Sequence, residues 1–365
     1  MKTVILTGGG TAGHITPNIA LIPKLLQAGF TVHYIGLKGG MEEKLVAPLG
    51  VQFHGITGGK LRRYADLKNV TDVFKIGAGF FEAGRLIRKI RPDVVFSKGG
   101  FVSTPVVWAA SLGGVPVVIH ESDSTVGLAN RLSVPFAAKV CHTFPETAGY
   151  LPKGKGVWTG LPIRPELLSG SRSAGLALCG FTEEKPVIVV TGGSQGSGFI
   201  NGLVRGSLDR LLEIFQVCHI CGKGNLKPEL EGRRGYRQFE YVTEKQPDLF
   251  AMADIFITRG GATSIFEILE LKKPNIIIPY SKKASRGDQI INAQSFKKQG
   301  FSEVLAEVDE QGAPLTQEAF LSTLTAVYND RSQYITAMGR SSAKNGLENV
   351  FRVICETADT AKKDN

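Results

Sequence analysis

The chain has 365 residues, more than one hydrophobic core usually supports, so we expect two domains of ordinary size. Apolar residues at 42% and charged residues at 21% are typical of a soluble globular protein. The balance of 43 Lys and Arg against 33 Asp and Glu attracts anionic partners such as nucleic acid, anionic lipid or phosphorylated substrates. The apolar run at residues 4–6 is too short for a secretion signal, so we expect a cytoplasmic protein.

Two features could mislead this assignment. The longest uncharged run, residues 99–119, has the length of a membrane span, but Pro105 and Pro116 divide it into a helix and a strand of soluble core. The five cysteines do not fit a disulfide framework. Residues 218–221, Cys-His-Ile-Cys, lie in a strand-like run without a second ligand pair, so we expect a buried, reduced pair, with a metal or redox site as the alternative.

In chain order, apolar runs of strand length alternate with helical patterns almost from end to end. The predicted strands of the first half are residues 4–6, 31–35, 51–56, 93–97, 115–120 and 139–143. The pattern restarts at 186–190 and continues with strands at 216–220, 239–242, 255–258 and 275–279. This alternation predicts an α/β protein with parallel sheets that carry helices on both faces. Ligands of such sheets bind beyond the carboxyl ends of the strands, where the glycine loops lie.

The boundary between the two halves is expected around residues 160–173, where prolines, glycines and three serines cluster. We assign residues 1–163 to an N-terminal domain and 164–365 to a C-terminal domain. Residues 316–357 have a helical pattern, and the last helix is a candidate to pack back on the N-terminal domain.

The first glycine loop, residues 7–17, lies between a strand and a helix. Its glycines let the backbone approach a ligand closely, and the start of the helix presents free N–H groups to negative charge, so the loop suits a phosphate. His14 lies at its mouth as a candidate for chemistry; the alternative is a helix residue without a chemical role.

The spacing of Gly8, Gly10 and Gly13 also fits a dinucleotide-binding unit. Such a unit needs an acidic side chain at the end of the second strand to bind the ribose. That strand ends in Gly-Leu-Lys at 36–38, and Glu42 comes a turn too late. The sequence therefore disfavours an oxidoreductase.

A second candidate site is residues 259–267, again a strand, a glycine turn and a helix start. Free N–H groups near Ala262, Thr263 and Ser264 would suit a diphosphate. Glu267, one turn into the helix, can accept hydrogen bonds from two ribose hydroxyls; the alternative is an acid favoured by the helix dipole.

Asp288 and Gln289 lie at the entry to a later helix. Together they can bracket the hydroxyls of a sugar ring, although either alone would be an ordinary cap or surface residue. No Asp-x-Asp occurs in the sequence, so a metal clamped to a nucleotide by carboxylates is not indicated.

These segments, in this order, resemble the two-domain GT-B glycosyltransferases and, within them, the MurG family. The resemblance implies two Rossmann-like domains whose parallel sheets face each other across a cleft, and no cofactor. It implies inverting transfer of N-acetylglucosamine from UDP-N-acetylglucosamine to the C4 hydroxyl of the muramyl sugar of lipid I, which makes lipid II for peptidoglycan synthesis, cell shape and division. The matching segments are residues 8–14, 98–103, 120–121, 127–130, 160–164, 192–196 and 259–267.

The resemblance also implies roles for individual residues. His14 is the implied base or orienting group for the acceptor hydroxyl, with Asn130 assisting it. The acceptor-binding set is Gly10, Thr11, Gly13, Gly99, Gly100 and Asp123. The donor-binding set is Arg164, Ser194, Gln195, Val242, Ala262, Thr263, Ser264, Glu267, Asp288 and Gln289.

One position departs from the family pattern. Much of the family has His-Glu-Gln-Asn where residues 120–123 are His-Glu-Ser-Asp. An Asp in place of an Asn exchanges a group that donates and accepts for one that only accepts, so a donor contact assigned to that Asn does not transfer to Asp123.

A lipid-linked acceptor requires contact with a bilayer. Aromatic, aliphatic and basic residues that could lie on an anionic membrane surface occur in residues 61–89; the alternative is a partly buried helix with solvated charges. The expected partners are thus both substrates, the cytoplasmic face of the cell membrane and cell-wall synthesis proteins. The residues are Leu61, Arg62, Arg63, Lys68, Val73, Phe74, Lys75, Ile76, Phe80, Phe81, Arg85, Arg88 and Lys89.

Two other functions are kept as alternatives. One is another GT-B enzyme that acts on a diacylglycerol or a natural product. The other is a nucleic-acid-binding protein, which only the charge suggests, because the sequence has no recognisable reading motif.

Overall fold

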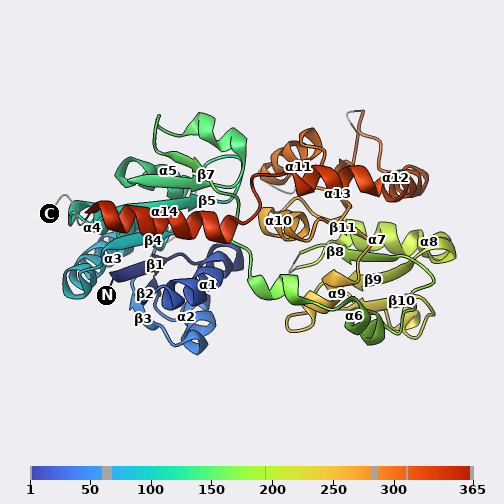
Figure 1. Cartoon of the computed structure of the whole chain (residues 1–365), viewed down its shortest axis with the longest axis horizontal. Helices are drawn as coiled ribbons and strands as arrows, with labels where there is room; N and C mark the ends of the chain where they lie inside the picture. Colours follow the sequence, from blue (N-terminus) through green and yellow to red (C-terminus); the bar gives the residue numbers. More distant parts are fainter. Residues whose placement is uncertain (1, 60–67, 194, 282–286, 310, 362–365) are drawn as a thin grey trace. The chain divides into compact units, whose positions relative to one another are not determined.

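The computed structural model describes residues 2–59, 68–193, 195–281, 287–309 and 311–361. The chain divides into two compact units, each with its own sheet. Unit 1 comprises Met1–Arg164 and Ser342–Asn365, and unit 2 comprises Pro165–Ser341. The chain thus leaves unit 1, forms unit 2 and returns to unit 1 (Figure 1).

The sheet of unit 1 is parallel throughout, in the order β3-β2-β1-β4-β5-β6-β7 within the described residues. Strands β2 and β3 lie on one side of β1, and β4 to β7 lie on the other, so the strand order reverses between β1 and β4. Ligands of α/β sheets bind at such a switch point. The strands are β1 Lys2–Thr7, β2 Phe30–Leu37, β3 Gln52–Ile56, β4 Val94–Ser97, β5 Val117–Glu121, β6 Lys139–His142 and β7 Gly156–Trp158.

Helices cover both faces of this sheet because successive strand residues point to opposite sides. Val4 and Leu6 of β1 join a core with the apolar faces of α1 and α14, whereas Ile5 joins the other core with α3 and α4. Figure 1 shows α14, in red, along β4 and β5. The helical segments are α1 Ala12–Gln27, α2 Met41–Val46, η1 Ala47–Leu49, α3 Lys68–Ile90, α4 Ser103–Leu112, α5 Leu128–Ser133, η2 Val134–Phe136, η3 Pro145–Tyr150 and α14 Gly346–Ala361.

Unit 2 repeats the same topology. Its parallel sheet has the order β10-β9-β8-β11-β12-β13, with the reversal between β8 and β11. The strands are β8 Val187–Thr191, β9 Gln216–Ile220, β10 Tyr236–Phe239, β11 Ile255–Thr258, β12 Asn275–Ile277 and β13 Glu303–Val304. The helical segments are η4 Pro165–Ser169, α6 Arg172–Cys179, α7 Gly198–Gly206, α8 Leu208–Ile214, η5 Pro228–Leu230, α9 Gln246–Ala251, α10 Ala262–Leu271, α11 Asp288–Lys298, α12 Gln317–Asn329 and α13 Arg331–Gly339. Two parallel α/β sheets confirm the predicted fold class.

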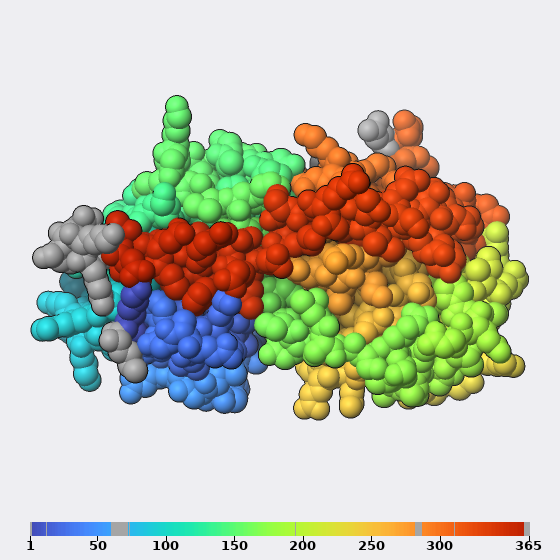
Figure 2. Space-filling view, in the orientation of Figure 1, coloured from blue at the N-terminus to red at the C-terminus, as the bar shows by residue number. Residues whose placement is uncertain are grey.

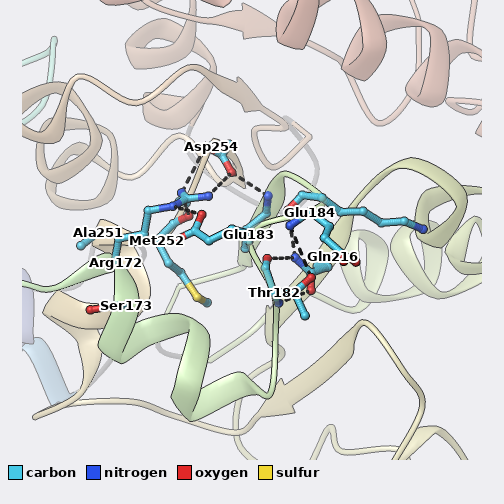
Figure 3. A network of polar contacts seen from close by, with 12 residues as sticks. Arg172, Ser173, Thr182, Glu183, Glu184, Gln216, Ala251, Met252 and Asp254 are labelled. Atoms are coloured by element: carbon cyan, nitrogen blue, oxygen red, sulfur yellow. Dashed lines mark hydrogen bonds and ion pairs between the residues drawn. The ribbon is translucent and has the colours of Figure 1, made fainter.

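A polar network ties α6 to the amino ends of β8 and β11 (Figure 3). The guanidinium of Arg172 contacts both carboxylate oxygens of Asp254, at 3.2 and 3.3 Å, and donates to Glu183 at 3.0 Å. Asp254 also accepts from the backbone N–H of Val187 at 2.8 Å. This network fixes α6 against the amino ends of two neighbouring strands of the unit 2 sheet.

The structure corrects one predicted strand and adds two. The strand predicted at 239–242 is wrong: β10 is Tyr236–Phe239, because Gln238 is buried through hydrogen bonds to Lys227 and thus interrupts the apolar run. The short strands β7 and β13 were not predicted, since two or three residues give no readable alternation. Cys218 and Cys221 are buried and free of disulfides.

Candidate active site

The glycine loops that follow β1 and β4 touch each other at the switch point of unit 1. A Cβ on Gly100 would lie 2.4 Å from the carbonyl oxygen of Gly9 and 3.2 Å from Nδ1 of His14. Gly100 also has a φ of +87°, in the region that favours glycine. Only glycine therefore fits at position 100, and the two loops form one surface with His14.

The imidazole of His14 is half-buried in the first turn of α1. Its Nδ1 lies 3.3 Å from the carbonyl oxygen of Gly9 and 3.1 Å from Oγ1 of Thr11. A carbonyl oxygen can only accept, so the contact with Gly9 assigns the proton to Nδ1 and leaves the lone pair on Nε2. Burial, together with the charge of Lys98, lowers the pKa of His14 to about 4 against the contact with Gly9, which raises it. The ring is thus neutral at neutral pH and can accept a proton.

Buried polar side chains fix the floor of the first loop. The hydroxyl of Tyr34 donates to the carbonyl oxygen of Gly8 at 2.7 Å and accepts from Nδ2 of Asn18 at 3.1 Å. The carboxylate of Glu42 accepts from the backbone N–H of Leu37 at 2.7 Å and lies where a side chain on Gly9 would be, 2.3 Å from that Cβ position. The carbonyl of Gly8 and the path of the loop are therefore fixed by these buried side chains.

Asn130 lies behind Gly99 and is tied to the end of β5. Its Nδ2 donates to the carboxylate of Glu121 at 2.8 Å and to the backbone oxygen of His120 at 3.2 Å. Its buried Oδ1 has no hydrogen-bond partner among the described residues and lies 3.0 Å from the Cβ position of Gly99. Asn130 is thus a rigid neighbour of the second loop with one acceptor to spare.

Arg259 connects the loops of unit 2. Its buried guanidinium donates to the carbonyl oxygen of Ile278 at 2.8 Å and to Oγ of Ser197 at 2.5 Å, and pairs with Glu307 at 2.7 Å. The same group stacks on the ring of Tyr280, 4.0 Å from the ring centre. One side chain therefore fixes the segments that follow β8, β11 and β12 at the carboxyl edge.

The start of α11 packs directly on the glycine turn before α10. A Cβ on Gly260 would lie 2.4 Å from the carbonyl oxygen of Gln289. Asn292 donates to the carbonyl oxygen of Gly260 at 3.1 Å, and Oε1 of Gln289 accepts from the N–H of Tyr280 at 3.4 Å. The N-termini of α10 and α11 are thus side by side at the carboxyl edge of the unit 2 sheet.

Comparisons with known proteins agree with this architecture. The model of the glycosyltransferase family 28 N-terminal domain matches residues 4–142, and that of the C-terminal domain matches residues 187–350. The chain belongs to the MurG family of these glycosyltransferases. It is therefore a glycosyltransferase.

Among curated MurG relatives, the UDP-N-acetylglucosamine--N-acetylmuramyl-(pentapeptide) pyrophosphoryl-undecaprenol N-acetylglucosamine transferase of Clostridium tetani is 53% identical over 97% of both chains. That of Lachnospira eligens is 52% identical over 97% of this chain and 99% of the relative. The crystal structure of MurG from Acinetobacter baumannii superposes with a TM-score of 0.74 at 24% identity, over 98% of this chain and all of the other. A UDP-GlcNAc 2-epimerase from Neisseria meningitidis, solved with UDP-GlcNAc, shares the fold with a TM-score of 0.65 at 13% identity over 99% of this chain and all of the other.

The structure gathers most of the residues implied by the MurG resemblance at these two edges. In unit 1, Gly10, Thr11, Gly13 and His14 lie on the first loop and helix start, Gly99 and Gly100 on the second, and Asp123 and Asn130 after β5. In unit 2, Gln195 follows β8, Ala262, Thr263, Ser264 and the buried Glu267 lie in α10, and Asp288 and Gln289 begin α11.

Three residues of the donor set stand apart. Val242 follows β10, two strands from β8, at the same edge of the sheet. Arg164 is half-buried and is the last residue of the first segment of unit 1. Ser194 lies outside the described residues.

Several buried groups at these edges were not assigned a role from the sequence. They are Lys98 and Glu121 in unit 1 and Arg259 with Ser197 in unit 2. The available signal was a charged side chain immediately after an apolar strand, which fits Lys98 and Arg259. Within the part of the chain that the structure describes, no three His, Cys, Asp or Glu residues form a metal site.

Among the helices that the structure describes, none combines the length and apolar character needed to cross a bilayer.

Proposed function

We propose that this chain transfers N-acetylglucosamine from UDP-N-acetylglucosamine to the C4 hydroxyl of the muramyl sugar of lipid I, with inversion at the sugar carbon. The relatives named as UDP-N-acetylglucosamine--N-acetylmuramyl-(pentapeptide) pyrophosphoryl-undecaprenol N-acetylglucosamine transferases match 97% of the chain at about half identity. The observation that carries the chemistry is the neutral imidazole of His14 on a surface made of two touching glycine loops.

The proposed reaction is a single displacement. The C4 oxygen of the acceptor forms a bond to the anomeric carbon, the bond from that carbon to the UDP oxygen breaks, and the hydroxyl proton passes to Nε2 of His14. A base with a pKa near 4 takes this proton only as the new bond forms, because the hydroxyl becomes strongly acidic at that stage. The departing diphosphate needs positive charge, which we assign to the N-terminus of α10 and to Arg164.

The donor is assigned to unit 2. Backbone N–H groups of Ala262, Thr263 and Ser264 bind a phosphate, with Gln195 and Ser194 beside it. Glu267 accepts from the ribose hydroxyls, and Asp288 and Gln289 accept from or donate to the sugar hydroxyls. The backbone near Val242 reads uracil.

The acceptor is assigned to unit 1. The backbone of Gly10, Thr11, Gly13, Gly99 and Gly100 borders its diphosphate, because a surface without side chains admits close approach. Asn130, whose buried Oδ1 has no hydrogen-bond partner among the described residues, supports this surface from behind Gly99.

Helix α3 is the proposed contact with the membrane. Phe74 and Phe81, two turns apart on one face, are 76% and 66% exposed, and Lys75, Arg85 and Arg88 are exposed beside them. In Figure 2, cyan atoms of this region lie on the surface of unit 1. Aromatic side chains flanked by cations suit an anionic bilayer, so we assign the protein to the cytoplasmic face of the cell membrane as a peripheral enzyme, where cell-wall synthesis proteins are its neighbours. Residues 61–63 of the predicted surface lie outside the described residues, as do the side chains of Lys68 and Val73.

The deciding experiment compares acceptors. Radiolabelled N-acetylglucosamine from the UDP donor is expected on a lipid I analogue and not on diacylglycerol. Transfer to diacylglycerol alone would identify the other kind of GT-B enzyme, and a clear preference for a different nucleotide sugar in thermal protection would contradict the donor assignment.

A further inference from the structure

The carboxylate of Glu307 bridges two segments at the carboxyl edge of the unit 2 sheet. Glu307 follows β13, and its side chain is 14% exposed. Its Oε1 pairs with the guanidinium of Arg259 at 2.7 Å, and its Oε2 accepts from the backbone N–H of Ser281 at 3.3 Å. Arg259 lies directly before the glycine turn of α10, and Ser281 lies in the segment that follows β12. One carboxylate therefore joins these two segments.

Tyr280 makes a second connection between the same segments. Its ring lies beneath the guanidinium of Arg259, 4.0 Å from the ring centre, and its hydroxyl donates to the carbonyl oxygen of Gly196 at 3.3 Å. Its backbone N–H donates to Oε1 of Gln289, in the first turn of α11, at 3.4 Å. Residues 280–281 thus connect Glu307 to Gln289, a residue of the donor set.

The contact with Tyr280 decides which end of the Gln289 side chain is left for a ligand. A backbone N–H can only donate, so it takes the carbonyl oxygen of the carboxamide and leaves the N–H donors of Nε2. The carboxylate of the neighbouring Asp288 only accepts when it is ionised. In the proposed donor site, Gln289 therefore donates to a sugar oxygen, and Asp288 accepts from a sugar hydroxyl.

Glu307 is also the counter-charge of a buried cation. Arg259 is 4% exposed, and it donates to the carbonyl oxygen of Ile278 and to Oγ of Ser197 besides its pairing with Glu307. A buried ion pair is weak evidence for stability, because the desolvation of both charges offsets much of their attraction. The pair does fix the position of the carboxylate, so that its second oxygen reaches Ser281.

We propose that Glu307 is a positioning residue for sugar specificity, which fixes residues 280–281 and thereby the carboxamide of Gln289 against the sugar of the donor. The proposal rests on the proposed function, because it takes Asp288 and Gln289 as the contacts of the sugar hydroxyls. Hydrogen bonds weaken steeply when donor and acceptor are misaligned, so a carboxamide held in one place distinguishes the two orientations of a hydroxyl.

The test replaces Glu307 by glutamine, which has the same shape but a single acceptor oxygen. Glu307→Gln cannot accept from both Arg259 and Ser281, and its amide nitrogen then faces one of the two donors. The charged guanidinium makes the stronger hydrogen bond, so the N–H of Ser281 is expected to lose its partner. Amide hydrogen exchange of Ser281 is therefore expected to become faster in the free protein, a measurement that needs no substrate.

Nucleotide binding, measured by calorimetry, is the second readout. The wild type is expected to prefer UDP-N-acetylglucosamine to its C4 epimer, UDP-N-acetylgalactosamine. Glu307→Gln is expected to reduce this preference roughly tenfold, about the contribution of one hydrogen bond of Gln289. The affinity for UDP stays at the wild-type value, because UDP lacks the sugar. Glu303→Gln, which removes the ion pair of β13 with Lys297 at 2.5 Å, is the matched control and changes neither affinity nor preference.

Two further variants test the same connection. Glu307→Asp keeps the charge beside Arg259 but is one methylene shorter, so it is expected to fold where the loss of charge prevents folding, and to lower the preference as well. Tyr280→Leu removes the ring beneath Arg259 and is expected to act in the same direction. Its matched control is Tyr328→Leu, which removes a ring 4.6 Å from the guanidinium of Arg331 and leaves the preference unchanged.

The outcomes separate positioning from general damage. An unchanged preference in folded Glu307→Gln, or in Glu307→Asp if the former does not fold, overturns the proposal. An equal loss of affinity for UDP and for UDP-N-acetylglucosamine also overturns it, because such a loss indicates damage to the whole of unit 2. Tighter binding of UDP overturns it as well, since Glu307 would then act by offsetting the charge of Arg259.

Failure of the proposed function gives a different result. Absence of transfer to lipid I contradicts the acceptor assignment and leaves the binding preference measurable. A wild type that binds both nucleotide sugars equally contradicts the donor assignment, and the specificity role of Glu307 falls with it, even where the exchange of Ser281 responds. A preference that is present in the wild type and unchanged in the variants overturns the role of Glu307 alone.

Discussion

Gly100 and His14 are so close that a methyl group on Gly100 would come within 3.2 Å of Nδ1 of His14. The same methyl group would meet the carbonyl oxygen of Gly9 at 2.4 Å, so it would push both partners of the imidazole contact apart. The geometry of His14 thus depends on the absence of a side chain from another loop.

Gly100→Ala is therefore expected to lower sugar transfer at least tenfold. Gly114→Ala is the matched control, because Gly114 has a similar φ of +76° but open space around its Cβ position. Both variants lose roughly 1–2 kcal/mol through the left-handed backbone, measurable by urea unfolding. Equal activity in the two variants would show that the contact with Gly9 and His14 is unimportant.

His14→Ala is expected to reduce kcat roughly 10²- to 10⁴-fold, the usual contribution of a general base. The affinity for UDP-N-acetylglucosamine, measured by calorimetry, stays at the wild-type value because the donor is assigned to unit 2. His33→Gln, at a half-buried histidine of β2, serves as the control. A parallel loss of turnover and affinity, or no change in either, would contradict the role of His14.

Glu267→Gln is expected to weaken UDP-N-acetylglucosamine binding about tenfold or more, since hydrogen bonds to a charged group contribute roughly 1.5–3 kcal/mol each. The wild type should bind the 2′-deoxy nucleotide more weakly than the normal one, and the variant should discriminate less. Glu270→Gln, further along α10, should bind as the wild type does. Equal wild-type affinity for both nucleotides would argue against ribose recognition by Glu267.

Because of the buried His219, we expect the free energy of unfolding to fall in acid. Asn201 donates to Cys221 at 2.9 Å through Nδ2, so its Oδ1 accepts from Nε2 of His219 at 2.9 Å, and Nδ1 of His219 accepts from Tyr236 at 3.0 Å. Burial, then the charge of Arg205, lowers the pKa of His219 to about 3. As the pH falls below 6.5, the unfolded chain takes up this proton before the folded one, so stability falls toward pH 3.

One such group contributes about 1.4 kcal/mol per pH unit to the slope of the free energy of unfolding between pH 6 and 4. Urea unfolding at several pH values is expected to give a shallower slope in His219→Gln by about this amount. His33→Gln, half-buried, should change the slope less. Identical slopes for the wild type and His219→Gln would contradict the assignment.

The membrane surface is tested by co-sedimentation with anionic vesicles. Phe74→Ser with Phe81→Ser is expected to lower binding tenfold or more, since burial of one Phe contributes roughly 1.5–3 kcal/mol. Ile214→Ser, at a half-exposed side chain of α8 in unit 2, is the control. If binding depended on neither salt nor anionic lipid, this result would contradict an electrostatic contribution to the interaction.

The strands of both sheets were largely predictable because the central ones are buried on two faces and read as continuous apolar runs. The predicted runs at 216–220 and 255–258 coincide with β9 and β11. The prediction of the edge strand β10 was wrong because Arg237 is exposed and Gln238 is buried through local hydrogen bonds. Side-chain pairing of that kind leaves no pattern in hydrophobicity.

The glycine loops of the candidate site were also predictable from the sequence, since a run of glycines directly after a strand is typical of a ligand-binding loop. The contact between Arg259 and Ser197 could not be predicted from the sequence, because the two residues are 62 positions apart and are brought together only by the strand order of unit 2. Lys98 was visible as a charge after an apolar strand, but the carboxylates that act on it, Glu121 and Asp123, lie at and after the end of a different strand. Chemistry within one loop can be inferred from sequence, whereas chemistry between loops requires the topology.

The return of α14 to unit 1 has a consequence for synthesis on the ribosome. Val350 and Ile354 complete a core whose other side chains, such as Leu21 of α1, are translated more than 300 residues earlier. All of Pro165–Ser341 leaves the ribosome before α14 does, so unit 2 can fold while the part of the first sheet that α14 covers is still exposed. The nascent chain therefore exposes an apolar surface for most of its translation. Chaperones can bind this surface during that interval.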